Sequence, residues 1–312
     1  MLLLVFASVA FGSCSKFSNG PVIPEERHRG PFQIIEICDN VDVNLKHCDN
    51  ANHPGDITIK TNKNLMENIG TDTTEVEIKA PYNGDTITYH FTKLKITNNN
   101  SLNFLRPYDY NLEMTVYYDS LYELIFNSNA TVNTDTLRGY NYPTHFSSVE
   151  GSDYDSLTPN LVLDIEGGSG DFQIKTHCYR LITKYIHGTS NLTFCGQANR
   201  IETWADYDCH GVIDGFNAEA LDYHQITNLG TNMIIAKAFK RINGLNDNIG
   251  HIYYLRYKKT LPVAHSIYND HGHWIGTQIE DSTYHCPLDV SKAGAYKENI
   301  TSVTEHPIPG HQ

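Results

Sequence analysis

Residues 161 to 257 align with themselves at a shift of twenty residues. Three columns keep this register: Leu161, Leu181, Ile201, Leu221 and, one residue late, Ile242; Phe172, Leu192, Val212 and Ile252; and the small residues Cys178, Ala198, Ala218 and Ala238. A unit of this length cannot bury its own apolar face, so neighbouring units must stack on one another. The period therefore predicts an all-β fold, a parallel β-helix or solenoid-like stack with rungs of about twenty residues. An antiparallel sandwich with evenly spaced strands is the alternative.

The chain before this repeat is also predicted to be β. Strand-like runs such as DITIKT, TEVEIKA, DTITYHF and KLKIT are separated by Asn, Gly and Pro clusters, and no window before residue 120 has sustained helical spacing. We therefore divide the body into an N-terminal β region over residues 32–118, β-solenoid repeats over 119–261 and a C-terminal segment over 262–312 that breaks the period.

The first fourteen residues, MLLLVFASVAFGSC, form an apolar run too short to span a bilayer as a permanent helix. The small residues before Cys14 resemble the lipobox of bacterial lipoproteins, although Phe11 stands where a smaller aliphatic residue is usual and no basic segment precedes the run. We expect residues 1–14 to be a signal peptide ending at a lipidated Cys14, and the polar residues 15–31 to be a flexible tether. A buried N-terminal strand is the alternative for the apolar run.

Six further cysteines remain, an even number in a compartment that permits disulfides. Cys38 and Cys48 are close in sequence and match no structural zinc spacing, so a disulfide that closes a hairpin-like loop is the candidate. The net charge of -13, with no run of Lys and Arg, argues against nucleic acid as a partner.

Four stretches carry a family resemblance: GPFQIIEICDNVDVNLKH, NLMENIGTDTTEVEI, the Gly-Ser-Gly corners and NIGHIYY. Together they resemble the autotransporter adhesin head, or GIN, domain of bacterial envelope lipoproteins, over roughly residues 30 to 260. The resemblance implies a right-handed β-helical fold, a location outside the cytoplasm and an adhesive or polysaccharide-binding role. It supplies no catalytic residues and no cofactor.

Stacked rungs would place residues one period apart side by side on one face. With Leu181, Ile201 and Leu221 inward, the outward residues would be Glu202, Asp222, Lys184, Trp204 and His224. An exposed tryptophan among polar side chains is typical of a sugar-binding strip, where the ring stacks on a pyranose. The alternative is a tryptophan folded over a rung for packing.

Glu202 and Asp222 also raise the possibility of polysaccharide hydrolysis or lysis, because glycosidases use two carboxyl groups at a defined separation. Stacked carboxylates are equally a common solvated surface, and the chain contains no GxGxxG, GxxxxGK[ST], HExxH or GxSxG motif. We therefore expect a protein without catalytic activity and without a cofactor.

The segment after residue 261 is rich in histidine, and His271, His273 and His285 have the side-chain type of metal ligands. A segment that covers the open edge of the last rung is the alternative, because stacks of this kind need capped ends.

Together, these expectations describe an exported outer-membrane lipoprotein that is attached to the membrane through its lipid alone. We expect it to bind a polysaccharide or a cell-surface protein. The sequence SKFSNG after Cys14 lacks an acidic cluster, which favours the periplasmic over the surface face. A structural envelope component that only spaces its partners is the second hypothesis, and a polysaccharide-cleaving enzyme is the third.

Overall fold

The computed structural model describes residues 19–48, 52–82, 85–100, 112–127, 129, 131–147, 153–238, 241–247, 249–256, 264–268, 277–279 and 303–305. Most of these residues lie in strands, and the one helix among them is the single turn α2, Lys63–Met66. No helix in this part of the chain is long and apolar enough to cross a membrane. The predicted all-β class is confirmed. The predicted signal peptide and lipidated Cys14 lie outside the described residues.

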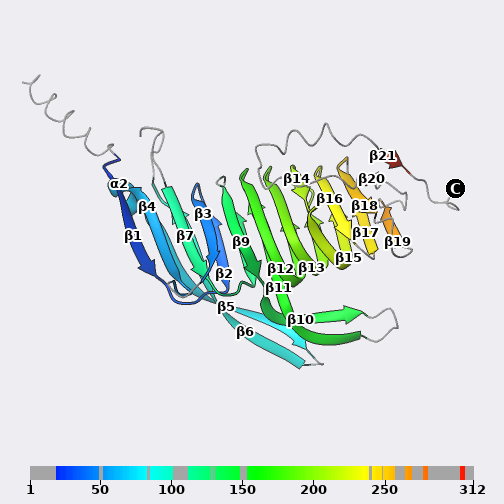
Figure 1. The fold of residues 1–312 in the computed structure, drawn as a ribbon, viewed down its shortest axis with the longest axis horizontal. Coiled ribbons are helices and arrows are strands. Elements are labelled where there is room, and N and C mark those ends of the chain that lie inside the picture. Colours follow the sequence, from blue (N-terminus) through cyan, green and yellow to red (C-terminus); the bar gives the residue numbers. More distant parts are fainter. Residues whose placement is uncertain are drawn as a thin grey trace, which may run out of the picture.

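The strands form one curled sheet that is best followed as two rows (Figure 1). The first row begins with an edge strand and runs toward the C-terminal end of the molecule. In spatial order it contains β1 (Val22–His28), β4 (Asp56–Asn62), β7 (Leu112–Tyr118), β3 (Asp42–His47), β9 (Val132–Arg138), the first half of β12 (Asp171–Tyr185), the first half of β13 (Asn191–Ala205), β14 (Val212–Asp214), β16 (Met233–Ala238), β18 (His251–Arg256), β20 (Thr277–Ile279) and β21 (Val303–Glu305).

The second row begins with a long hairpin. Its order is β5 (Ile69–Tyr82), β6 (Asp85–Asn98), β2 (Ile34–Cys38), β8 (Glu123–Asn127), β11 (Asp153–Gly167), the second halves of β12 and β13, β15 (Ala218–Asn228), β17 (Arg241–Asn246) and β19 (Ala264–Tyr268). The outer part of the β5–β6 hairpin and the hairpin of β10 (Tyr140–Ser147) with β11 project away from the rows in Figure 1. Because β12 and β13 run through both rows, the rows are two walls of one sheet.

The two rows enclose one continuous core. Phe126 of β8, in the second row, stacks on Phe172 of β12, in the first row, with ring centroids 4.2 Å apart. Both rings are fully buried. Alternate residues of each strand face this core, as the pleat requires, and Leu161, Leu181 and Ile201 are buried as predicted.

The twenty-residue register is present where the sequence shows it most clearly. Leu161 pairs with Leu181, and Leu181 with Ile201, in parallel strands. Two corner glycines have positive φ, 96° at Gly168 and 106° at Gly188. A Cβ on Gly188 would lie 2.4 Å from the carbonyl oxygen of Gly168, so the corners stack too closely for any side chain. The described strands therefore form a curled, half-barrel sheet that is parallel except at the pairs β1–β4, β4–β7, β5–β6, β10–β11 and β20–β21.

The predicted register is wrong at β15. Ile201 pairs with His224 rather than Leu221, a shift of three residues: two additional residues precede Ala218, and a third, a bulge, lies between Ala220 and Tyr223. This bulge turns Leu221 outward, where 37% of its surface is exposed, and turns His224 into the core.

The other two columns also slip earlier than predicted. Leu192 pairs with Ile213 instead of Val212, and Ala198 with Ala220 instead of Ala218. The register therefore begins to change before Leu221, and it changes again after it, because His224 pairs with Ile242 at an offset of 18 residues.

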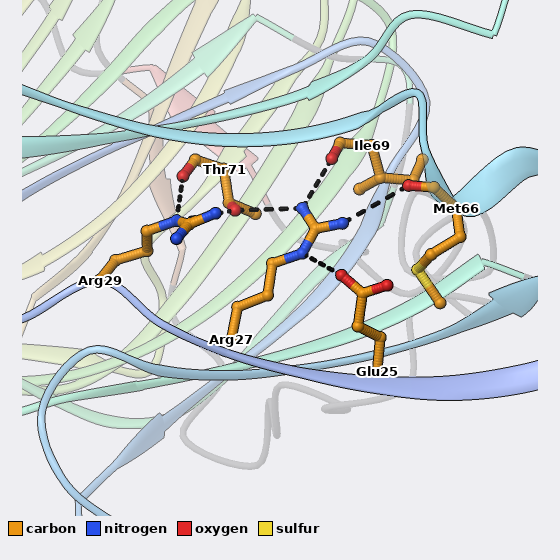
Figure 2. Close-up of polar contacts among 6 residues, drawn as sticks. All are labelled: Glu25, Arg27, Arg29, Met66, Ile69 and Thr71. Carbon is orange, nitrogen blue, oxygen red and sulfur yellow. Dashed lines mark hydrogen bonds and ion pairs between the residues drawn. The ribbon is translucent and has the colours of Figure 1, made fainter.

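The predicted tether over residues 15–31 is wrong for β1, which pairs with β4 over its whole length. Arg27 of β1 and Arg29, just after it, reach across the end of the core to the start of β5, in the other row (Figure 2). Arg27 donates hydrogen bonds to the carbonyl oxygens of Ile69 (2.7 Å) and Met66 (3.4 Å) and pairs with Glu25. Arg29 donates to the carbonyl oxygen of Thr71 at 2.7 Å. Side chains thus close this end of the core.

We expect Arg27→Met to lower the free energy of unfolding by about 2 kcal/mol, because two carbonyl oxygens and Glu25 lose their charged donor. Urea unfolding at neutral pH measures this loss. Lys60→Met on neighbouring β4 is the matched control, since Lys60 is exposed and forms only a surface ion pair with Glu113. Equal losses in the two variants would contradict the role given to Arg27.

Candidate functional site

The outer surface of the second row carries polar side chains from four adjacent strands. With Leu161, Leu181 and Ile201 inward, the neighbouring residues of β8, β11, β12 and β13 face out. We call this surface the charged face; its residues are Glu123, Asp164, Arg180, Lys184, Glu202 and Trp204. In the sheet register Asp164 lies beside Lys184 and Lys184 beside Trp204, so three strands contribute one outward column.

Lys184 lies between two carboxylates. Its Nζ is 3.1 Å from Asp164 Oδ2 and 3.7 Å from Glu123 Oε1. Burial raises the pKa of Glu123, the Lys184 ammonium opposes this, and the charges of Asp164 and Glu166 add to the rise. Glu123 is therefore protonated more readily than an ordinary glutamate.

Glu202 is held by Arg180. The guanidinium donates from Nε at 2.8 Å and from Nη2 at 2.7 Å to the two carboxylate oxygens, a bidentate pair. Glu202 pairs in register with Gln225 because of the bulge in β15. The prediction that Glu202 and Asp222 lie side by side on adjacent strands is therefore wrong, and the side chain of Asp222 lies outside the described residues.

Trp204 is exposed, as the sequence predicts, with 47% of its surface accessible. Its neighbours in register are Lys184 on β12 and Thr227 on β15. One face of the indole is thus available next to a cation and a hydroxyl group, the kinds of donor that bind sugar hydroxyls.

His224, predicted to point outward, is fully buried. Its Nε2 lies 3.0 Å from Thr203 Oγ1, and burial lowers its pKa to about 4. The bulge in β15 explains the difference, because it moves His224 into the apolar column of Ile201. His224 is a neutral core residue and does not belong to the charged face.

An aromatic cluster adjoins the charged face on the side of Glu123. It consists of Tyr89 and Phe91 of β6, Tyr122 before β8, and Tyr140 and Tyr142 of β10. Ring centroids are 4.6 Å apart for Tyr122 and Tyr142 and 4.9 Å for Phe91 and Tyr122. Burial raises the pKa of Tyr122 and Tyr142, and the charge of Glu123 adds to both shifts. The cluster therefore joins the two projecting hairpins directly beside Glu123.

The predicted disulfide between Cys38 and Cys48 is not formed. Cys38 ends β2, whereas Cys48 follows β3 at the far end of six extended residues that span roughly 17 Å, and a disulfide needs Cα atoms within about 7 Å. The Cys38 thiol instead donates to Glu36 at 3.3 Å, and burial together with that carboxylate raises its pKa to about 11. The predicted metal ligands His271, His273 and His285 lie outside the described residues.

Sequence reasoning missed Glu123, Asp164 and the aromatic cluster. Asp164 stands twenty residues before Lys184, so the repeat itself could have found it. Glu123 could not be found in this way, because β8 and β11 pair at an offset of 39 residues, between Glu123 and Val162.

No protein-family model and no curated protein matches the chain. Solved structures do resemble it. A putative adhesin from Bacteroides fragilis, 15% identical, aligns with 81% of this chain and 99% of its own, with a TM-score of 0.56. A putative adhesin from Parabacteroides merdae (16% identical, 84% and 96%, TM-score 0.48) and a putative lipid binding protein from Parabacteroides distasonis (15%, 83% and 96%, 0.45) are more distant. The first likeness shows a shared fold.

Proposed function

We propose that the protein is a glycan-binding adhesin that recognises its ligand along the charged face and the aromatic cluster. The observation that carries this proposal is the outward column of Asp164, Lys184 and exposed Trp204. An aromatic ring can stack on the apolar face of a pyranose while ionised neighbours accept and donate hydrogen bonds to its hydroxyl groups. The fold shared with a putative adhesin from Bacteroides fragilis supports the same role.

The shape of this surface favours an extended ligand. Glu123, Asp164, Lys184 and Trp204 come from four successive strands, which are spaced about 4.8 Å apart in a sheet. A row of this kind spans about 14 Å, so it can contact more than one sugar of a polysaccharide. A single monosaccharide would use only part of it.

The remaining expectations from the sequence belong to the same proposal. We infer a right-handed parallel β-helix-like stack, a lipid anchor at Cys14 and display in the outer-membrane envelope, with a polysaccharide or a cell-surface protein as the partner. The parallel twenty-residue register supports the stack. We propose no catalytic activity, because Glu202 is engaged by Arg180 and Asp164 is engaged by Lys184.

A glycan array tests the proposal. We expect the wild-type protein to bind a subset of polysaccharides and Trp204→Ala to bind them at least about tenfold more weakly, which corresponds to about 1.4 kcal/mol. Trp204→Phe should retain part of the affinity, because it keeps a ring for stacking.

Tyr207→Ala is the matched control, since Tyr207 is also an exposed aromatic residue but lies in the turn after β13. The proposal fails if the wild type binds no glycan or if Trp204→Ala binds as well as Tyr207→Ala. Release of new reducing ends from a bound polysaccharide, abolished by Glu123→Gln, would instead assign cleavage to this face.

A further inference from the structure

A second group of side chains, on the first row, has the chemistry of a metal site. Strands β3 and β7 run parallel, with His47 beside Tyr118 at their carboxyl ends. The pairing continues for one more residue, because the Cys48 N–H donates to the Tyr118 carbonyl oxygen at 2.8 Å. Cys48 and Asp119, the next residues of the two strands, therefore emerge side by side next to the His47 imidazole.

One ligand atom each from His47, Cys48 and Asp119 lies within 4.8 Å of the other two. His47 Nε2 and Asp119 Oδ1 are 3.8 Å apart. Ligands at about 2.0 to 2.3 Å from a tetrahedral zinc ion lie roughly 3.3 to 3.8 Å from one another. Small rotations of the Cys48 and Asp119 side chains are therefore enough to bring all three atoms around one ion.

The imidazole is held in place without using the nitrogen that would bind the ion. The His47 ring packs edge-on against Tyr118, with centroids 5.9 Å apart. Asp135 accepts hydrogen bonds from the backbone N–H of His47 at 2.7 Å and from the Tyr118 hydroxyl at 2.9 Å, which positions the His47 backbone and the Tyr118 ring against which the imidazole packs. His47 Nε2 itself is buried and has no hydrogen-bond partner among the described residues. A buried polar nitrogen without a partner is costly, and a bound ion would remove that cost.

We propose that His47, Cys48 and Asp119 bind one divalent transition-metal ion of the zinc class. Imidazole nitrogen, thiolate sulfur and carboxylate oxygen are all zinc ligands, and three protein ligands leave a fourth position for water or another ligand. His47 also lines a hollow of about 790 Å³ whose other walls include Asp135, Arg138 and His177. This site is independent of the charged face, which is on the other row.

Metal titration of the full-length chain tests the proposal. After removal of metal with a chelator, zinc is added in competition with a metal-sensitive dye, and cobalt is added in a parallel experiment. We expect one ion to bind per chain at this site, a thiolate-to-cobalt charge-transfer absorption in the near ultraviolet, and a zinc-dependent rise in melting temperature. Cys48→Ser should abolish the absorption, and Asp119→Asn should weaken zinc binding at least about tenfold.

Three controls separate this site from other thiols and imidazoles. Cys38→Ser and Cys14→Ser should leave the cobalt absorption unchanged, and a variant with glutamine at His271, His273 and His285 should keep the zinc-dependent rise in melting temperature. Asp119 is exposed, so Asp119→Asn should unfold like the wild type when metal is absent. An unchanged cobalt absorption in Cys48→Ser, loss of binding in the tail variant alone, or no binding by the wild type would each overturn the proposal.

Discussion

Phe126→Ala is expected to lower the free energy of unfolding by about 3 to 5 kcal/mol, the range for aromatic residues deleted from a packed core. Phe126 is fully buried and stacks on Phe172, so the ring joins the second row of strands to the first. Its removal leaves a space between two walls of a sheet that cannot move together freely, because β12 and β13 run through both walls. Urea unfolding followed by circular dichroism measures the loss.

Two further variants define what Phe126 contributes. Phe126→Leu keeps most of the volume and should cost less than Phe126→Ala. Ile249→Ala removes an apolar side chain that is exposed to solvent and should change stability by no more than about 0.5 kcal/mol. If Phe126→Ala cost no more than Ile249→Ala, the two rows would not be packed against each other as described.

The second large effect depends on pH and involves Glu36. Burial would raise the pKa of its carboxyl group, but hydrogen bonds from Lys93 and Lys95, each 2.6 Å long, outweigh burial and lower the pKa to about 2. Since the folded pKa is below the unfolded value of about 4.3, the ionised group stabilises the folded state above that value. This contribution is lost as the pH falls from about 5 to about 2.

The shift corresponds to about 2 to 3 kcal/mol at neutral pH, after allowance for solvent screening of the partly exposed Lys95. We therefore expect Glu36→Gln to be less stable than the wild type by this amount at pH 7 and nearly equal to it at pH 2. Urea unfolding at several pH values measures the difference. Glu113→Gln, which removes a surface ion pair with Lys60, should differ little from the wild type at any pH. A constant difference between Glu36→Gln and wild type would show that Glu36 acts through packing instead.

The sequence predicts the middle of the body well because one offset holds there. Within residues 160–205, paired strand residues are twenty positions apart in the sequence. Apolar residues that recur at this period therefore lie next to one another on adjacent strands. The bulge in β15 breaks this rule. From residue type alone, Leu221 is predicted to be buried and His224 exposed, whereas the structure has Leu221 exposed and His224 buried. The backbone pairing of β13 with β15, which places His224 beside Ile201, decides between the two arrangements.

The residues of the candidate sites likewise divide into those that the twenty-residue period predicts and those that it does not. Trp204 and Lys184 could be placed together from the period alone, whereas Glu123 and the aromatic cluster are brought in by hairpins that interrupt it. His47, Cys48 and Asp119 meet because β3 pairs with β7, across about seventy residues of chain. A single sequence contains no periodic signal for that pairing. The stretch that contains β1 is predicted to be a tether because it is polar and contains three prolines, and Ile23 is the one apolar residue among the half-buried positions of the strand.

The open side of β1 bears on how the protein behaves at high concentration. Within the described part of the chain β1 pairs with β4 alone, so its other side presents unpaired backbone groups. Pro24 removes one of the donors that a foreign strand would need, and Glu26 and His28 put polar side chains along the same strand. If two molecules met edge to edge at β1, the two β1 strands could not form a complete ladder of backbone hydrogen bonds. The molecule is thereby protected at β1 against edge-to-edge aggregation into fibres.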